Sequence, residues 1–279
     1  MGLKSIVRRL LPRRHVPHRI LSGPLRGLRI VTSWHDYPAA ICGYTEPRLV
    51  HWLLDNARRG ETWLDVGANC GYTSLALCRR VGPTGRVYAF EPALATAACL
   101  ERTGQVNGFD QLVAVPLALS DAPAPTILRF TSDRGMIDSQ LTADDSPETA
   151  QVMAVSLDAI WNGIAPPDPT IHGIKIDIQG MELDALRGME WTLARSRPKL
   201  VLEIHPGVPR DEVLALLESC GYHDEPIPLD DSLGEFRDPQ SNASFLFLPT
   251  EPKAPAASPV QEVRHDSAAT PVLAAARRD

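Results

Sequence analysis

The stretch WLDVGANCGYTSLAL, residues 63–77, decides the fold of this 279-residue chain. Its apolar start predicts a short buried strand over Thr62–Val66. A glycine-rich turn follows, and the apolar spacing of Tyr72–Val81 predicts a helix that Gly82 ends. In open α/β sheets, ligands bind outside the carboxyl ends of the strands, where this turn would lie. The stretch therefore predicts both a parallel sheet and a ligand site at its edge.

Strand and helix patterns alternate along most of the remaining chain. Further strands are predicted at Arg86–Phe90, Leu112–Leu119, Thr126–Thr131, Gln151–Leu157, Ile174–Ile178 and Lys199–Ile204. Helices are predicted at Pro47–Arg59, Ala93–Thr103 and Met181–Ala194, and after an N-cap at Asp211. Two short strands are expected within Ile20–Val31, and a closing antiparallel pair at Tyr222–Leu229 and Ser244–Leu248. This alternation predicts an α/β fold with a mostly parallel sheet that is covered by helices on both faces.

The turn and the next strand together predict a nucleoside-containing cofactor. Gly67 and Gly71 allow the backbone to approach a ligand closely, and the helix that follows offers free N–H groups to an anion. Glu91 ends the second strand, twenty residues after Gly71. A carboxylate at that place can accept hydrogen bonds from both ribose hydroxyls.

The spacing of the turn favours S-adenosylmethionine over a dinucleotide. In the dinucleotide fingerprint G-x-G-x-x-G the middle glycine makes room for the pyrophosphate, but here Asn69 occupies that place. Asp65, two residues before Gly67, would repel a pyrophosphate and attract the ammonium group of a methionine moiety. The predicted cofactor-binding residues of this region are Asp65, Gly67, Asn69, Gly71 and Glu91. Ala118, Ser120 and Asp121, at the end of the predicted third strand, are expected to frame the adenine.

A set of motifs resembles a known family. DVGANCGY, VYAFEP, LALSD, SLDAI, IKIDIQGMELDALRGM and KLVLEIH look like the ordered motifs of the FkbM-type S-adenosylmethionine-dependent methyltransferases. SGPLRGLRI and GYTEPRLVHWL are similar to the region that precedes these motifs in that family, so the resemblance covers Ile20–Pro249. It implies a class I methyltransferase fold with a Rossmann-like, seven-stranded sheet. It also implies O-methylation, commonly of hydroxyls on sugars or natural products.

Two single residues gain a meaning from this resemblance. Glu46 in GYTEP matches a family glutamate that faces the cofactor. Gln179 stands where the family usually has Glu, ahead of Gly180 and Glu182. If that glutamate has a catalytic or metal role elsewhere, this chain lacks it, which leaves a non-catalytic, methyltransferase-like binding protein as an alternative.

Asp177 and His205 are the predicted catalytic residues. Each lies at the end of a predicted strand, so both should point into the same crevice. Methyl transfer from a sulfonium needs good positioning and a deprotonated hydroxyl, so a base should lie near the acceptor. The ordinary pKa of histidine suits this task, and Asp177 can accept a proton in the transition state. A structural histidine that bonds a backbone carbonyl is the open alternative for His205, and Lys175 and Glu182 are expected to serve structure or helix-end electrostatics.

A metal or disulfide site is not predicted. Asp177, Glu203 and His205 offer oxygen and nitrogen ligands, and the last two face the same side of one strand, but no dedicated metal motif is present. None of the five cysteines forms a C-x-x-C pair, which argues against structural zinc and favours reduced thiols.

Charge and hydropathy exclude several classes of protein. The net charge of −6 excludes a generally basic nucleic-acid binder. No run of 18 apolar residues exists, so we predict no transmembrane segment. Arginines interrupt any apolar stretch near the N-terminus, so we expect no signal peptide and a cytoplasmic protein. The first 35 residues hold eight Lys or Arg and no acid. Residues 1–19 are therefore a basic segment that either contacts anionic membrane weakly or is a solvated terminus.

The predicted organisation is a basic segment at 1–19, a methyltransferase domain at 20–249 and a disordered Ala/Pro-rich tail at 250–279. The polar loop around Arg134–Gln140 is either a substrate lid or a disordered insertion. The predicted function is S-adenosylmethionine-dependent O-methylation of a hydroxyl on a saccharide, glycan or secondary metabolite. The competing hypotheses are an NAD-dependent oxidoreductase and the non-catalytic binding protein.

Overall fold

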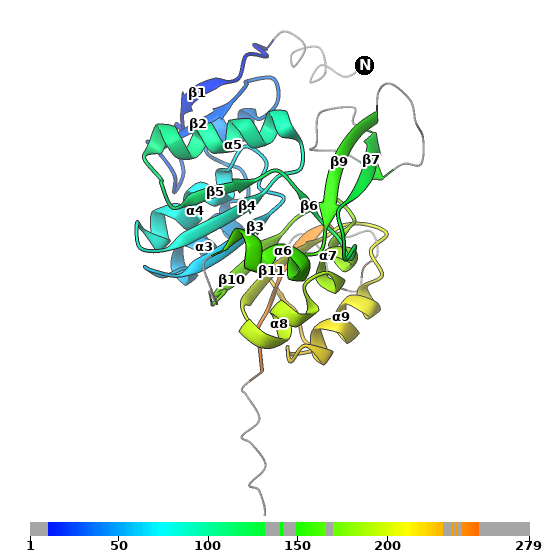
Figure 1. The fold of residues 1–279 in the computed structure, drawn as a ribbon. Coiled ribbons are helices and arrows are strands. Elements are labelled where there is room, and N and C mark those ends of the chain that lie inside the picture. The colour runs from blue at the N-terminus through cyan, green and yellow to red at the C-terminus, as the bar shows by residue number, and fades with distance from the viewer. Residues whose placement is uncertain are drawn as a thin grey trace, which may run out of the picture.

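The computed structural model describes residues 11–131, 140–141, 149–165, 170–230, 236, 238 and 242–250 (Figure 1). Its strands are β1 (Val16–Arg19), β2 (Arg29–Thr32), β3 (Thr62–Val66), β4 (Arg86–Phe90), β5 (Leu112–Val115), β6 (Ala118–Leu119), β7 (Thr126–Thr131), β8 (Gln140–Leu141), β9 (Thr149–Val155), β10 (Gly173–Ile176), β11 (Lys199–Ile204), β12 (Ile227–Pro228) and β13 (Ala243–Phe247). Its helices are α2 (Pro38–Cys42), α3 (Pro47–Asn56), α4 (Tyr72–Val81), α5 (Leu94–Asn107), α6 (Leu157–Ile164), α7 (Glu182–Arg187), α8 (Glu190–Ser196) and α9 (Arg210–Ser219).

A seven-stranded sheet forms the centre of the molecule, with the strand order β12-β13-β11-β10-β3-β4-β5. The pairs from β11 to β5 are parallel, and β13 pairs antiparallel with both β11 and β12. The predicted mostly parallel, seven-stranded α/β sheet is therefore confirmed, as is the closing antiparallel pair. The chain leaves β3 for β4 on one side and returns to β10 on the other, which makes the end of β3 a topological switch point.

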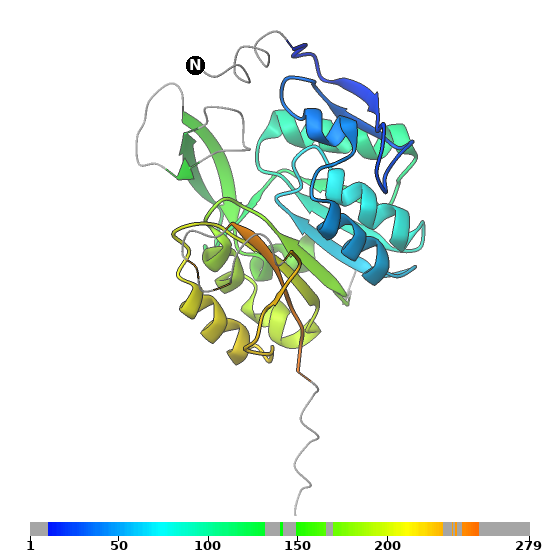
Figure 2. The same ribbon diagram turned by 180° about the vertical axis from the view of Figure 1, so that it is seen from behind.

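Two apolar clusters cover the opposite faces of this sheet. Alternate strand residues point to opposite faces, so Trp63 and Val87 belong to one cluster while Leu64 and Tyr88 belong to the other. Helices α3 and α4 pack into the first cluster, and α6 to α9 pack into the second. In Figures 1 and 2 these two groups of helices lie on opposite sides of the molecule.

A second, four-stranded sheet in the order β6-β9-β7-β8 projects beside the carboxyl end of the main sheet (Figure 1). It corrects two sequence predictions. The single strand predicted at Leu112–Leu119 is two strands, because the chain leaves the main sheet after Val115 and Ala118 pairs with Ala154 of β9. The strand predicted at Gln151–Leu157 ends at Val155, because Ser156 caps α6 by accepting a hydrogen bond from the Ala159 N–H.

The N-terminal elements also differ from the prediction. The two strands expected within Ile20–Val31 are Val16–Arg19 and Arg29–Thr32, which pair antiparallel. Residues 16–19, assigned to the basic segment, thus belong to the folded part. Helix α2 was not predicted.

Four helices begin or end elsewhere than predicted. Helix α3 ends at Asn56 instead of Arg59, and α5 spans Leu94–Asn107 instead of Ala93–Thr103. The helix expected at Met181–Ala194 is broken into α7 and α8 at Gly188. A Cβ at Gly188 would lie 1.8 Å from the Ser120 carbonyl oxygen, so the chain turns where it passes that strand end. Helix α9 begins one residue before Asp211, with Pro209 as its N-cap, which corrects the predicted cap.

The predicted tail at 250–279 lies outside the described residues except for Thr250, and the predicted loop at Arg134–Gln140 lies outside them except for Gln140 of β8, which pairs with Thr131. The first ten residues also lie outside the described residues. Within the described ranges, no helix has the length and apolar character needed to cross a bilayer. All five cysteines are free thiols.

Candidate functional site

The turn after β3 is held in a conformation that glycine permits. Gly67 has φ of +79°, and Gly67 N–H and Ala68 N–H both donate to the Phe90 carbonyl at 3.0 Å. A Cβ on Gly67 would lie 1.8 Å from the backbone oxygen of Asp177. Only glycine therefore lets the end of β3 lie this close to the end of β10.

A cavity of about 370 Å³ opens at the carboxyl ends of β3, β4 and β10. Its size lies within the range of roughly 300–1,000 Å³ that small-molecule sites occupy. Six of the predicted site residues line it: Glu46, Gly67, Asn69, Glu91, Ala118 and Asp177. The ligand site predicted at this edge of the sheet thus coincides with a cavity.

The other predicted site residues lie outside the lining. Gly71 packs α4 against α5, because a Cβ there would lie 2.7 Å from Leu100 Cδ1. Ser120 is buried, and its N–H donates to the Val155 carbonyl at 3.1 Å, while Asp121 is exposed. The roles of Ser120 and Asp121 as adenine neighbours gain no support from this placement and stay predictions.

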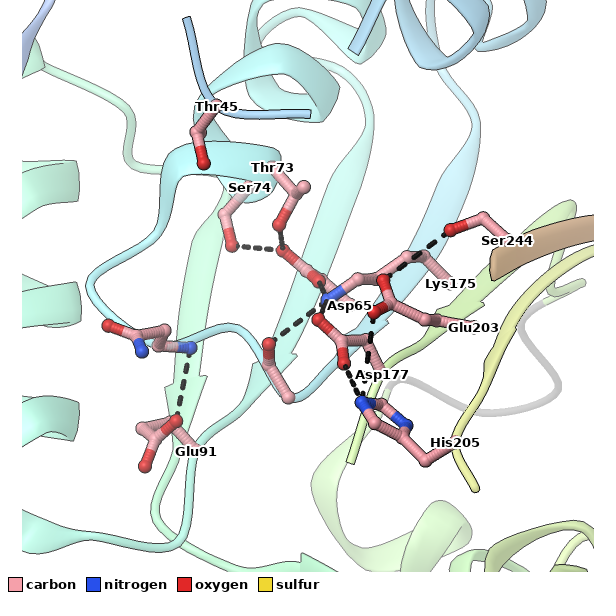
Figure 3. A network of polar contacts seen from close by, with 12 residues as sticks. Thr45, Asp65, Thr73, Ser74, Glu91, Lys175, Asp177, Glu203, His205 and Ser244 are labelled. Carbon is pink, nitrogen blue, oxygen red and sulfur yellow. Dashed lines mark hydrogen bonds and ion pairs between the residues drawn. The ribbon is translucent and has the colours of Figure 1, made fainter. Parts of the chain in front are cut away.

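Glu91 is buried at the cavity wall, with each carboxylate oxygen held by one backbone group. Asn69 N–H donates to Oε2 at 3.0 Å (Figure 3), and Ala93 N–H donates to Oε1 at 3.0 Å. Burial raises the pKa of Glu91 to about 7, although these two hydrogen bonds act in the opposite direction. A carboxylate has about four acceptor positions, so Glu91 can still accept hydrogen bonds from a ligand.

Asp65 stabilises the site from behind the cavity wall. It is fully buried, and its Oδ2 accepts hydrogen bonds from the hydroxyls of Thr73 at 2.8 Å and Ser74 at 2.5 Å (Figure 3). Its Oδ1 lies 3.4 Å from the Nζ of Lys175, the residue opposite Asp65 in the register of β3 and β10. The ammonium partner of Asp65 is thus a lysine of this chain, and Asp65 does not line the cavity.

Lys175 connects the turn to the acidic residues of the site. Its Nζ donates to the Gly67 carbonyl at 3.0 Å and lies 3.7 Å from Asp177 Oδ2. Burial acts to lower its pKa, but the charges of Asp65 and Asp177 prevail and hold the pKa above its ordinary value. Lys175 was expected to serve structure, and it also contributes to the cavity lining.

Three buried polar atoms of the cavity lining have no hydrogen-bond partner among the described residues. They are Glu46 Oε1, the hydroxyl of Tyr72 and Asp177 Oδ1. Burial, followed by the charge of Asp177, raises the pKa of Glu46 to about 7. Because such atoms are costly when unpaired, a ligand with hydrogen-bond donors would be favoured here.

Asp177 and His205 lie together, as predicted, and Glu203 joins them (Figure 3). The Nε2 atom of His205 is 3.6 Å from Asp177 Oδ1 and 3.7 Å from Glu203 Oε1. Burial raises the pKa of Glu203 to about 8, with further contributions from nearby carboxylates. Asp177 lines the cavity, whereas His205 lies behind it at 7% exposure.

Glu182 is a site residue whose role the sequence did not reveal. It is fully buried, and its Oε1 lies 2.6 Å from His205 Nδ1. Burial acts to lower the pKa of His205, but the hydrogen bond and charge of Glu182 outweigh it, so the pKa is raised. The open alternative, a histidine bonded to a backbone carbonyl, is wrong, because the Nδ1 partner is a carboxylate.

Residues 65–223, more than half of the chain, match the FkbM methyltransferase domain. The chain belongs to this family. It is 26% identical over 187 residues to the hexuronic acid methyltransferase AglP of Haloferax volcanii, an alignment that covers 63% of this chain and 69% of that protein.

Two solved structures match parts of this chain. The FkbM methyltransferase of Methylobacillus flagellatus is 17% identical with a TM-score of 0.45, over 71% of this chain and half of that chain. Fibrillarin of Aeropyrum pernix, solved with natively bound S-adenosylmethionine, is 13% identical with a TM-score of 0.43, over 85% and 88% of the two chains.

Family membership confirms three sequence predictions: the FkbM family, the class I methyltransferase fold and S-adenosylmethionine as cofactor. The residues present fit that cofactor. Glu91 offers acceptors for ribose hydroxyls, and the unpaired Glu46 oxygen offers one for an ammonium group. The assignment of individual residues to the cofactor stays a prediction.

Proposed function

We propose that this FkbM-family chain is an O-methyltransferase that acts on a hydroxyl of a saccharide or secondary metabolite. The observation that carries the proposal is the position of Asp177. Its carboxylate lines the cofactor cavity on one side and approaches His205 on the other. A hydroxyl placed beside Asp177 would meet proton-accepting groups next to the methyl donor.

The cofactor would lie with its nucleoside towards Glu91 and its methionine end towards Glu46. Glu91 accepts the ribose hydroxyls, since both its oxygens keep acceptor capacity after binding backbone N–H groups. Glu46 accepts from the ammonium group, which supplies the partner that Oε1 lacks. Asp65 does not contact the cofactor; it holds Lys175 and the start of α4 in place.

S-adenosylmethionine supplies a methyl group on a sulfonium. The acceptor oxygen forms a bond to that methyl group as the S–CH₃ bond breaks, and S-adenosylhomocysteine leaves with the electron pair of the broken bond. The hydroxyl proton passes to the carboxylate of Asp177, whose Oδ1 lies 3.6 Å from His205 Nε2 behind it. Glu182 fixes the imidazole by its hydrogen bond to Nδ1.

A carbohydrate acceptor is supported by one relative. The Haloferax volcanii protein of 26% identity is named a hexuronic acid methyltransferase. Acceptor pockets are built by variable loops, so the exact acceptor does not follow from the shared fold. We therefore propose the broader class, hydroxylated saccharides, with uronic-acid glycans as the first to test.

The test is a methyl-transfer assay with isotopically labelled S-adenosylmethionine. Acceptors are oligosaccharides with and without uronic acids, together with polyhydroxylated natural products. We expect label in at least one acceptor as a base-stable methyl ether. Asp177→Asn should lower turnover by roughly 10²-fold or more while S-adenosylhomocysteine binds with similar affinity. The exposed Asp110→Asn is the matched control and should transfer at the wild-type rate.

Two results would contradict the proposal. Label recovered only as a base-labile ester or on nitrogen would mean a different acceptor atom. Binding of S-adenosylhomocysteine with no transfer to any acceptor would favour the non-catalytic alternative that Gln179 leaves open.

A further inference from the structure

We propose that Asp177, Glu203 and His205 form a binding site for one divalent transition-metal cation, which holds the acceptor hydroxyl. This inference rests on the proposed function and assigns His205 the role of a ligand. It revises the expectation from sequence that no metal is bound. The three ligand atoms, one from each residue, lie within 4.8 Å of one another.

The inward-facing atoms of this cluster are all acceptors. Asp177 Oδ1 and His205 Nε2 are buried and have no hydrogen-bond partner among the described residues. When neutral His205 donates its Nδ1 proton to Glu182 at 2.6 Å, Nε2 carries the lone pair that a metal ion requires. That lone pair points at two carboxylate oxygens and is repelled by them. A cation placed between the three atoms would attract all of them.

The outward-facing atoms are held by other side chains, so the three ligands are oriented in advance. Asp177 Oδ2 faces Lys175 Nζ at 3.7 Å, and Glu203 Oε2 accepts from the Ser244 hydroxyl at 3.5 Å (Figure 3). The contact of His205 with Glu182 completes the set. Metal-bound histidines almost always donate their second N–H to a carboxylate, a carbonyl or water in this way.

The distances suit a small cation. Ligand atoms at about 2.1 Å from a tetrahedral ion lie roughly 3.4 Å from one another. The separations of His205 Nε2 from its two carboxylate neighbours are 3.6 Å and 3.7 Å, and all three ligand atoms lie within 4.8 Å of one another, so side-chain shifts of up to about 1 Å would complete the site. One imidazole nitrogen with two carboxylate oxygens favours Zn²⁺, Mn²⁺, Fe²⁺ or Co²⁺ over Mg²⁺ and Ca²⁺, which prefer oxygen alone.

The charge and the exposure of the cluster are also suitable. Asp177 and Glu203 are 22% and 18% exposed, so a ligand position stays open for a hydroxyl. Lys175 contributes a positive charge. Because Lys175 also pairs with Asp65, it does not fully neutralise the charge of Asp177. A hydroxyl bound to a divalent cation loses its proton more easily, which is the activation that methyl transfer needs.

The experiment uses the full-length chain, treated with EDTA and dialysed. Isothermal titration with Zn²⁺ and with Mn²⁺ should show one saturable site, and Mg²⁺ should bind more weakly. Glu203→Gln should lower the affinity for Zn²⁺ by more than tenfold. Glu182→Gln, which changes the support of His205, should lower it by about 10–100-fold. Glu218→Gln on the exposed face of α9 is the control and should bind like wild type.

Crystals soaked in Zn²⁺ give a readout that does not depend on a variant folding. An anomalous peak between His205 Nε2 and the two carboxylates is expected. A peak elsewhere, no saturable binding, or unchanged affinity in Glu203→Gln would overturn the proposal.

S-adenosylhomocysteine binding and methyl transfer separate this inference from the proposed function. Full transfer activity in protein shown to be metal-free would overturn the metal site and leave the O-methyltransferase proposal standing. Zn²⁺ bound at the three residues in a protein that transfers no methyl group would support the site and count against the proposed function.

Discussion

At the scale of single residues, Glu91 is expected to make cofactor affinity depend on pH. Its pKa is raised to about 7 mainly by burial, with Lys175 opposing and Asp65 supporting the shift. As the pH falls below that value, Glu91 takes up a proton and loses acceptor capacity for the ribose hydroxyls. Affinity for S-adenosylhomocysteine, measured by titration calorimetry, should therefore fall several-fold from about pH 8 to about pH 6.

The control for this prediction is Glu91→Gln, which cannot ionise. It should bind S-adenosylhomocysteine more weakly than wild type at pH 8, and its affinity should change less with pH. A wild-type affinity that stays constant across this range would show that Glu91 does not bind the ribose as an ionised acceptor. The raised pKa of Glu91 has the opposite effect on the stability of the ligand-free protein. The contribution of Glu91 to the free energy of unfolding falls as the pH rises from about 4.5 to about 7.

At the scale of elements, Gly67 fixes the distance between the ends of β3 and β10. Gly67→Ala would add a methyl group 1.8 Å from the Asp177 carbonyl, at a φ of +79°. Gly108 is a matched control, because its φ is +66° and no atom lies within 4 Å of the added Cβ. Both variants should lose about 1–2 kcal/mol from backbone strain, and Gly67→Ala should lose roughly 1–3 kcal/mol more from overlap.

Urea unfolding measures the stability loss of both variants, and titration with S-adenosylhomocysteine measures binding. Gly67→Ala should also weaken binding, since Gly67 lines the cavity, whereas Gly108→Ala should not. Equal stability losses in the two variants would mean that the chain relaxes around Gly67 without cost.

Elements whose bounds depend mainly on local sequence patterns were predictable from the sequence. The bounds of β3, α4 and β4 agree with the prediction, because apolar runs and glycine stops determine them. Helix α8 could not be separated from α7 by periodicity, since its first turn is capped from another helix: Asp158 accepts from Trp191 N–H and Thr192 N–H. The end of β9 was missed although Ser156 is a common N-cap residue.

In the candidate site, too, the features set by local sequence were predictable and those set by long-range contacts were not. Asp177 and His205 were predicted to face one crevice, because parallel strands bring their carboxyl ends together, and Glu203 was predicted to face the same side of its strand as His205. The pairing of Asp65 with Lys175 and of Glu182 with His205 depends on register and helix placement over long sequence separations, which no local pattern encodes. Sequence therefore predicted which residues meet but not which of them are already satisfied within the protein.

At the scale of the whole molecule, the cofactor cavity joins parts of the chain that lie far apart in sequence. Tyr37 and Glu46 line it from outside the matched family segment, alongside the turn after β3 and the end of β10. A ligand in this cavity would contact the N-terminal elements and the central sheet at once. Binding should thus protect both regions together, and by mass action it should stabilise the fold by about 2.7 kcal/mol at a ligand concentration of 100 times Kd.

Hydrogen exchange measured by mass spectrometry, with and without saturating S-adenosylhomocysteine, tests this coupling. Exchange should slow at residues 36–46, 67–71 and 90–93, while α9 on the far side of the second cluster should change only by the global term. NAD at the same concentration should cause no change, because Asn69 stands where a dinucleotide turn has its middle glycine and the Glu46 carboxyl in the lining opposes a pyrophosphate. Protection confined to residues 67–93 would mean that α2 and Glu46 do not contact the cofactor, and the ammonium of its methionine end would then need another partner than Glu46.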